Sequence, residues 1–144
     1  MNRWESLRAV RGTTTPPIAY DCMTSPLRPI VLIVDDECLI RSLAAEAFLD
    51  DGFLVLEAEH AAEALLVHAT GGPVHVLFTD VNMPGKMNGI DLAEHLKTLS
   101  PELCVIVASG LPVLRPIEHV PATFVAKPYD IHAVCATARE LLAA

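Results

Sequence analysis

The stretch Ile30-Val31-Leu32-Ile33-Val34-Asp35-Asp36-Glu37 decides the fold. Its first five residues are apolar and mostly β-branched, which favours a strand buried on both faces of a parallel sheet. Its last three residues are acidic and follow the strand directly. In open parallel sheets, functional groups gather at the carboxyl ends of the strands. The stretch therefore predicts a buried strand with a charged site at its end.

Outward from this strand, short apolar runs alternate with helical periods along the chain. Turn-forming residues such as Gly52 and Pro101 separate the segments. The further strands are predicted at 53–57, 74–79, 103–108 and 124–126, and the helices at 37–50, 60–69, 89–99 and 130–142. Such alternation in a short chain predicts an α/β fold with a doubly wound, five-stranded parallel sheet of (βα)5 type.

Residues 1–28 differ in composition from the rest. They include Gly12-Thr13-Thr14-Thr15-Pro16-Pro17, which is typical of a linker, so we expect a flexible N-terminal extension over 1–28 and a folded domain over 29–144. The extension has four arginines against two acids, whereas the remainder has six basic and sixteen acidic residues. Such an acidic domain repels nucleic acid, so we expect no nucleic-acid partner.

No apolar run in the chain is long enough to cross a bilayer. No apolar stretch follows the arginines near the N-terminus either, so we expect no signal peptide, no membrane partner and a cytoplasmic location.

Charged and polar residues end four of the predicted strands. Asp35 and Asp36 follow the first strand, Asp80 the third, Ser109 the fourth and Lys127 the fifth. Parallel strands bring these ends to one edge of the sheet. Close carboxylates repel one another, and a hard cation such as Mg²⁺, which also binds phosphate oxygens, removes that cost. The edge therefore predicts a metal-assisted phosphoryl site with Asp80 as nucleophile.

Each residue also has a simpler interpretation when taken alone. Asp35 and Asp36 suit the cap of the following helix. Asp80 and Ser109 suit the start of a turn, and Lys127 suits a solvated surface. Their convergence on one edge, rather than any single residue, carries the functional prediction.

The same positions resemble the response regulator receiver family of two-component signalling, whose fold is flavodoxin-like. The matching motifs, in family order, are Val-Asp-Asp-Glu (34–37), Thr-Asp-Val-Asn-Met-Pro (79–84), Asn-Gly (88–89), Ala-Ser-Gly (108–110) and Lys-Pro (127–128). The resemblance covers residues 30 to 144. It implies a phosphorylatable module that is no enzyme beyond accepting its own phosphoryl group and losing it slowly.

The resemblance also implies a role for each matched residue. Asp80 is implied as the phosphoacceptor, Asp36 as a direct ligand of Mg²⁺ (or Mn²⁺), and Asp35 as a ligand acting through water. The backbone carbonyl of Asn82 completes the implied metal site. Lys127 is implied to pair with the phosphoryl group. The two implied switch residues are Ser109 and Phe124, and plain core packing stays an alternative for the latter.

Two segments depart from the family pattern. The loop from Met83 to Gly89 is one residue longer than the commonest version. The segment between Ser109 and Lys127 is shorter by about one helical turn, and its prolines disfavour a regular helix. We therefore expect a short or irregular fourth helix.

Three functions are open at this point. In the first, a histidine kinase or histidine phosphotransfer protein donates the phosphoryl group, and an unidentified downstream protein reads the switch. In the second, the chain is a phosphatase with an aspartyl nucleophile, but the position that usually holds its general acid is Asn82. In the third, the fold serves as an interaction module that needs no phosphorylation.

Overall fold

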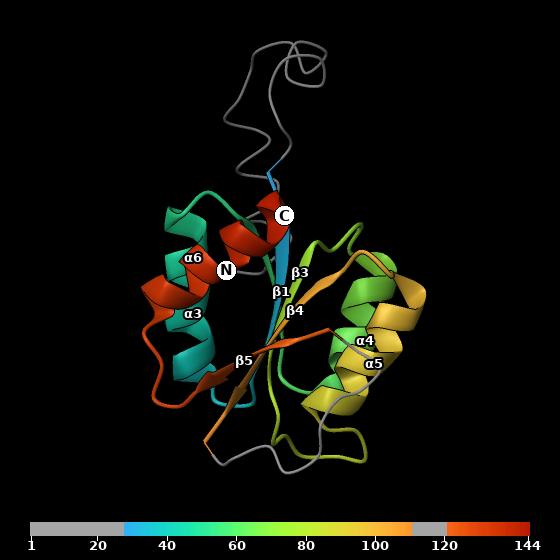
Figure 1. The fold of residues 1–144 in the computed structure, drawn as a ribbon. Helices are drawn as coiled ribbons and strands as arrows, with labels where there is room; N and C mark the ends of the chain where they lie inside the picture. The colour runs from blue at the N-terminus through green and yellow to red at the C-terminus, as the bar shows by residue number, and fades with distance from the viewer. Residues whose placement is uncertain (1–27, 111–120) are drawn as a thin grey trace.

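The computed structural model describes residues 28–110 and 121–144 (Figure 1). Its strands are β1 (Ile30–Val34), β2 (Leu54–Ala58), β3 (Val76–Asp80), β4 (Cys104–Ser109) and β5 (Thr123–Ala126). The helices within these ranges are α3 (Cys38–Asp50), α4 (Ala61–Thr70), α5 (Gly89–Leu99) and α6 (Ile131–Ala143). Each strand and helix predicted within these ranges is present, and its bounds lie within two residues of the prediction.

The five strands form one parallel sheet in the order β2-β1-β3-β4-β5. This order confirms the predicted doubly wound fold, because the chain passes from one side of β1 to the other between β2 and β3. Val34, the last residue of β1, pairs with Thr79 of β3. The carboxyl ends of β1 and β3 therefore lie side by side.

Helices cover both faces of the sheet. In Figure 1, α3 and α6 lie on one side of the strands and α4 and α5 on the other. Successive residues of β1 enter opposite cores: Val31 and Ile33 pack in the core that includes Phe48, whereas Leu32 packs in the core that includes Leu92. Strand β1 is thus buried on both faces, as its sequence predicts.

Two predictions fall largely outside the described residues. The flexible extension over 1–28 does so except for Arg28, and the short or irregular fourth helix falls on residues 111–120. Both stay predictions. Among the helices in the described ranges, none has the length and apolar character needed to cross a membrane.

Candidate functional site

Three carboxylates meet where β1 and β3 end. Asp35 and Asp36 follow β1, and Asp80 is the last residue of β3. One oxygen from each carboxylate lies within 4.8 Å of the other two. Asp35 and Asp80 are buried, whereas Asp36 is exposed. The structure therefore brings together the three acids on which the sequence analysis depends.

The surroundings of Asp35 disfavour its charge. Burial raises the pKa of this carboxyl above its usual range, and the nearby charges of Asp80 and Asp36 raise it further. The backbone N–H of Glu37 and the ammonium of Lys127 act in the opposite direction. A divalent cation would offset the repulsion among the acids. Because all the side-chain donors are carboxylate oxygens, the cluster fits Mg²⁺ or Mn²⁺.

The helix-cap interpretation of the first two acids fails. The N-cap residue of α3 is Glu37, and its side chain makes no capping hydrogen bond. Asp35 instead accepts a hydrogen bond from the Glu37 N–H at 2.9 Å through its Oδ1 atom. This bond uses one of the two oxygens of the Asp35 carboxylate and helps to orient it.

Lys127 forms an ion pair with Asp80. Its Nζ atom lies 2.9 Å from Oδ2 of Asp80. Burial alone would lower the pKa of Lys127, but the hydrogen bond and charge of Asp80, with the charges of Asp35 and Glu37, raise it above its ordinary value. The side chain is 24% exposed, so the interpretation as a solvated surface lysine fails.

The other predicted site residues are placed by the strands that carry them. Ser109 ends β4, is buried, and follows Ala108, which pairs with Asp80 in the sheet. Asn82 is exposed in the loop after β3. Phe124 lies in β5 and is 42% exposed, so plain core packing does not explain it.

Two residues near the site were not singled out from the sequence as site residues. A Cβ atom on Gly89 would lie 1.9 Å from the carbonyl oxygen of Asp80, so α5 begins directly against the backbone of Asp80. The Asn-Gly motif at 88–89 was the available signal. Arg41 is buried and donates to the carbonyl of Asp35. A lone arginine inside a predicted helix gave no signal of this contact.

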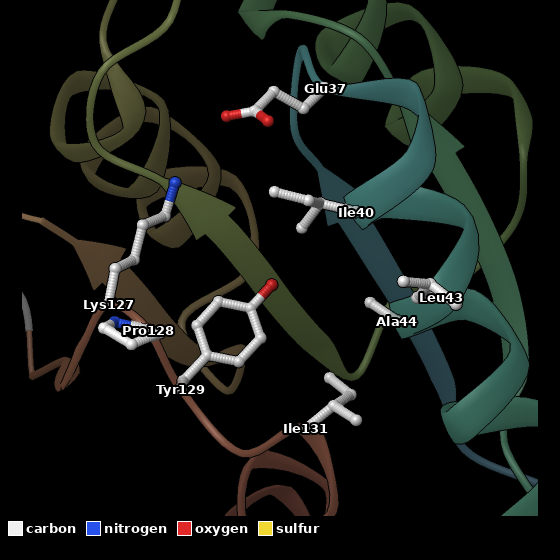
Figure 2. Close-up of a pocket in the computed structure, with 8 residues that line it drawn as sticks. All are labelled: Glu37, Ile40, Leu43, Ala44, Lys127, Pro128, Tyr129 and Ile131. Atoms are coloured by element: carbon white, nitrogen blue, oxygen red, sulfur yellow. The ribbon is translucent and has the colours of Figure 1, made fainter.

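An apolar groove runs from the site along α3. It encloses about 470 Å³ and lies between α3 and the segment that follows β5. Figure 2 shows the hydroxyl end of Tyr129 pointing toward α3, with Lys127 and Glu37 near one end of the groove. The lining residues are Glu37, Ile40, Leu43, Ala44, Lys127, Pro128, Tyr129 and Ile131. The groove therefore shares charged residues with the surroundings of Asp80.

Comparison with known proteins identifies relatives for most of the chain. Residues 31–139 match the family described as response regulator receiver domain. The chain is 32% identical over 105 residues to sporulation initiation phosphotransferase F of Bacillus subtilis, covering 70% of this chain and 83% of that protein. It is 32% identical over 117 residues to sensor kinase CckA of Brucella abortus, covering 78% of this chain but 12% of that protein.

Solved structures agree with these matches. The receiver domain of a hybrid histidine kinase CckA is 31% identical, with a TM-score of 0.68 over 78% of this chain and 98% of that one. A response regulator receiver protein from Sinorhizobium medicae is 21% identical, with a TM-score of 0.74 over 81% and 96%, and shows the fold alone. The chain therefore belongs to the response regulator receiver domain family, the phosphoacceptor modules of two-component and phosphorelay signalling.

Proposed function

We propose that Asp80 accepts a phosphoryl group from a phosphohistidine donor. The observation that carries this proposal is the buried Asp80 carboxylate, 2.9 Å from the Lys127 ammonium and within 4.8 Å of two further acids. An oxygen of Asp80 attacks phosphorus, the phosphorus–nitrogen bond breaks, and the imidazole leaves with the electron pair. Receiver domains are phosphoacceptors and not turnover enzymes, so the phosphatase interpretation is set aside.

The acids would hold the metal. Asp36 and Asp80 would bind Mg²⁺ (or Mn²⁺) directly, Asp35 through water, and the backbone carbonyl of Asn82 would supply a further oxygen. Bound there, the cation supplies neutralisation of the charge on the phosphoryl oxygens. The oxygen-only donor set and the raised pKa of Asp35 support this assignment.

Lys127 and Ser109 would bind the transferred group. Lys127 already contacts Asp80, and an ammonium there stabilises an incoming phosphoryl oxygen. Ser109 lies on the neighbouring strand, where its hydroxyl would donate to a second oxygen. Phe124 is exposed on β5, three residues before Lys127, and would change position when the serine engages the phosphoryl group. A downstream protein would read that change.

The donor would be a histidine kinase or histidine phosphotransfer protein that docks on the groove beside the site. Any donor must bring its histidine to Asp80, and the groove adjoins that residue's ion-pair partner, Lys127. On the same helix, Leu39 and Leu43 are 72% and 54% exposed. Exposed apolar side chains of this kind mark protein contacts. We propose a cytoplasmic location for this exchange and no nucleic-acid partner.

Incubation with Mg²⁺ and acetyl phosphate, followed by intact-mass measurement, tests the proposal. The wild type should gain one phosphoryl group, and Asp80→Asn should gain none. Asp50→Asn, which changes an exposed acid on α3, is the matched control and should gain one. An undiminished gain in Asp80→Asn would sink the assignment. If Asp80→Asn still signals like the wild type with its partner, the phosphorylation-independent interpretation holds instead.

A further inference from the structure

Arg41 is the one buried lysine or arginine among residues 28–110 and 121–144. It lies on α3 and is 7% exposed. No step of the proposed phosphoryl transfer uses it. Burying a charge is costly unless the charge is paired and hydrogen-bonded. The position of this guanidinium therefore needs a reason.

The guanidinium of Arg41 joins three segments of the chain. Its Nη1 atom donates to the carbonyl oxygen of Asp35 at 2.7 Å. Its Nε atom pairs with Oε1 of Glu57 on β2 at 3.1 Å, where both side chains are largely buried. Its Nη2 atom lies 4.0 Å from the exposed Glu59. The planar fork of an arginine suits such simultaneous contacts, because its donors hold a fixed geometry.

With the Arg41 contact, every backbone hydrogen-bonding group of Asp35, the first residue after β1, has a partner. The N–H of Asp35 donates to the carbonyl of Ala58 at 3.1 Å, and the Asp35 side chain accepts from the Glu37 N–H at 2.9 Å. Arg41 holds the remaining backbone group, the carbonyl. That carbonyl belongs to the peptide that joins Asp35 to Asp36, so holding it restricts the backbone from which both carboxylates extend.

We propose that Arg41 is a positioning residue for the cation site: it holds the Asp35–Asp36 peptide against the mutual repulsion of the acids. Glu57 orients the guanidinium from β2. The inference rests on the proposed function, because it assigns a cation to the acids. Groups that orient metal ligands without touching the metal typically change metal affinity about 10- to 100-fold when replaced.

The test compares Mg²⁺ affinity, followed by amide NMR shifts of the acidic turn, with phosphorylation rate from acetyl phosphate. Arg41→Gln should weaken Mg²⁺ binding about 10-fold or more. Arg41→Lys should lose less, because one donor can still reach the Asp35 carbonyl. At saturating Mg²⁺ the phosphorylation rate of both variants should return to within about twofold of the wild type, since the contacts of Asp80 and Lys127 are untouched.

Two further variants separate positioning from simple loss of stability. Arg41→Gln leaves the Glu57 carboxylate without its guanidinium, so Arg41→Gln/Glu57→Gln removes both charges and should fold while Mg²⁺ binding stays weak. Arg139→Gln breaks a guanidinium–carboxylate pair with Asp51, which is not in the acid cluster, and should bind Mg²⁺ like the wild type.

Wild-type Mg²⁺ affinity in Arg41→Gln, recovered affinity in the double variant, or equal weakening in Arg139→Gln would each overturn the inference. Failure of the proposed function would look different. In that case the wild type would bind Mg²⁺ and yet gain no phosphoryl group, and the comparison of affinities would still be readable.

Discussion

Two ion pairs lie at opposite ends of the segment from Lys127 to Arg139, and they have similar geometry. Lys127 Nζ lies 2.9 Å from Oδ2 of Asp80, and Arg139 Nε lies 2.6 Å from Oδ2 of Asp51. Their surroundings differ. The side chains of the first pair are 24% and 7% exposed, whereas those of the second are 54% and 39% exposed.

The difference shows that the environment, and not the distance, decides what an ion pair does. Water and salt screen the Arg139–Asp51 pair, so it contributes modestly to stability. Asp80 instead shares its surroundings with Asp35 and Asp36, and the ammonium of Lys127 offsets their repulsion. The Lys127–Asp80 pair is therefore part of the acid cluster's charge balance, whereas the Arg139–Asp51 pair is a structural contact between α6 and the end of α3.

The largest effect is expected on the phosphorylation rate when the Lys127–Asp80 pair is broken. Lys127→Met should slow phosphorylation by acetyl phosphate about 100- to 1,000-fold at saturating Mg²⁺, because a charge that stabilises the transition state is lost. Arg139→Met, which removes the corresponding cation of the exposed pair, should react at the wild-type rate. Time courses of intact mass measure both. Equal rates in the two variants would contradict the comparison.

The next largest effect is expected on the free energy of unfolding when Gly89, which packs against the backbone of Asp80, is replaced. Gly89→Ala would place a methyl group 1.9 Å from the Asp80 carbonyl oxygen. Overpacking of this kind costs about 1–3 kcal/mol, so the free energy of unfolding should fall by that amount. Gly110→Ala is the control, because no atom of residues 28–110 or 121–144 lies within 4 Å of its added Cβ. Urea titrations give both values, and a stable Gly89→Ala would show that α5 moves away freely.

A smaller effect is expected on stability when an acid is neutralised: replacing Asp35 in the buried cluster should stabilise the fold, and replacing Asp51 in the exposed pair should destabilise it. The pKa of Asp35 is raised in the fold, mainly by burial, above its ordinary value of 3.8. The folded chain therefore keeps this proton to a higher pH than the unfolded chain, and stability falls as pH rises through that window. Asp35→Asn removes the cost, so it should raise the free energy of unfolding at pH 7 without metal.

The gain in Asp35→Asn should shrink as pH falls toward 3.8, where the wild-type carboxyl also becomes neutral. Asp51→Asn makes the same chemical change in the exposed pair and should lower stability slightly. Thermal unfolding from about pH 7 down to pH 3.8 separates the two variants. A loss of stability in Asp35→Asn at pH 7 would show that its hydrogen bond outweighs its burial.

The smallest effect is the stability contribution of the exposed pair itself. Arg139→Met should lower the free energy of unfolding by less than about 1 kcal/mol, as is usual for exposed ion pairs. Part of that loss should persist in high salt, because the guanidinium also lies 5.5 Å from the centre of the Phe53 ring. Unfolding titrations with and without added salt measure the two parts.

Much of the fold was predictable because burial on two faces leaves a plain pattern. Val31 and Leu32 point into different cores, so every residue of β1 had to be apolar. The bounds were less predictable. Strand β3 begins at Val76 and not at Val74, although the His75 N–H still donates to the Ile30 carbonyl at 2.9 Å. The ring nitrogen Nδ1 of His75 also accepts the Ile30 N–H at 2.9 Å. Such a side-chain contact at a strand end leaves no periodic signal.

The site was predictable where residues end strands, and not where distant segments meet. Asp80 and Lys127 could be brought together by topology alone. The crowding of Gly89 against Asp80 and the bond from Arg41 to Asp35 depend on how helices approach the sheet. The exposure of Phe124 likewise follows from the place of β5 at the sheet edge, which strand order decides.

The most direct test of the central claim locates the phosphoryl group chemically. Borohydride reduces an acyl phosphate to an alcohol, which converts a phosphorylated aspartate to homoserine and releases phosphate. After treatment with acetyl phosphate and Mg²⁺, then borohydride and proteolysis, mass spectrometry should find homoserine at position 80 alone. Homoserine at position 35 or 36, or stable phosphorylation that borohydride does not remove, would contradict the account.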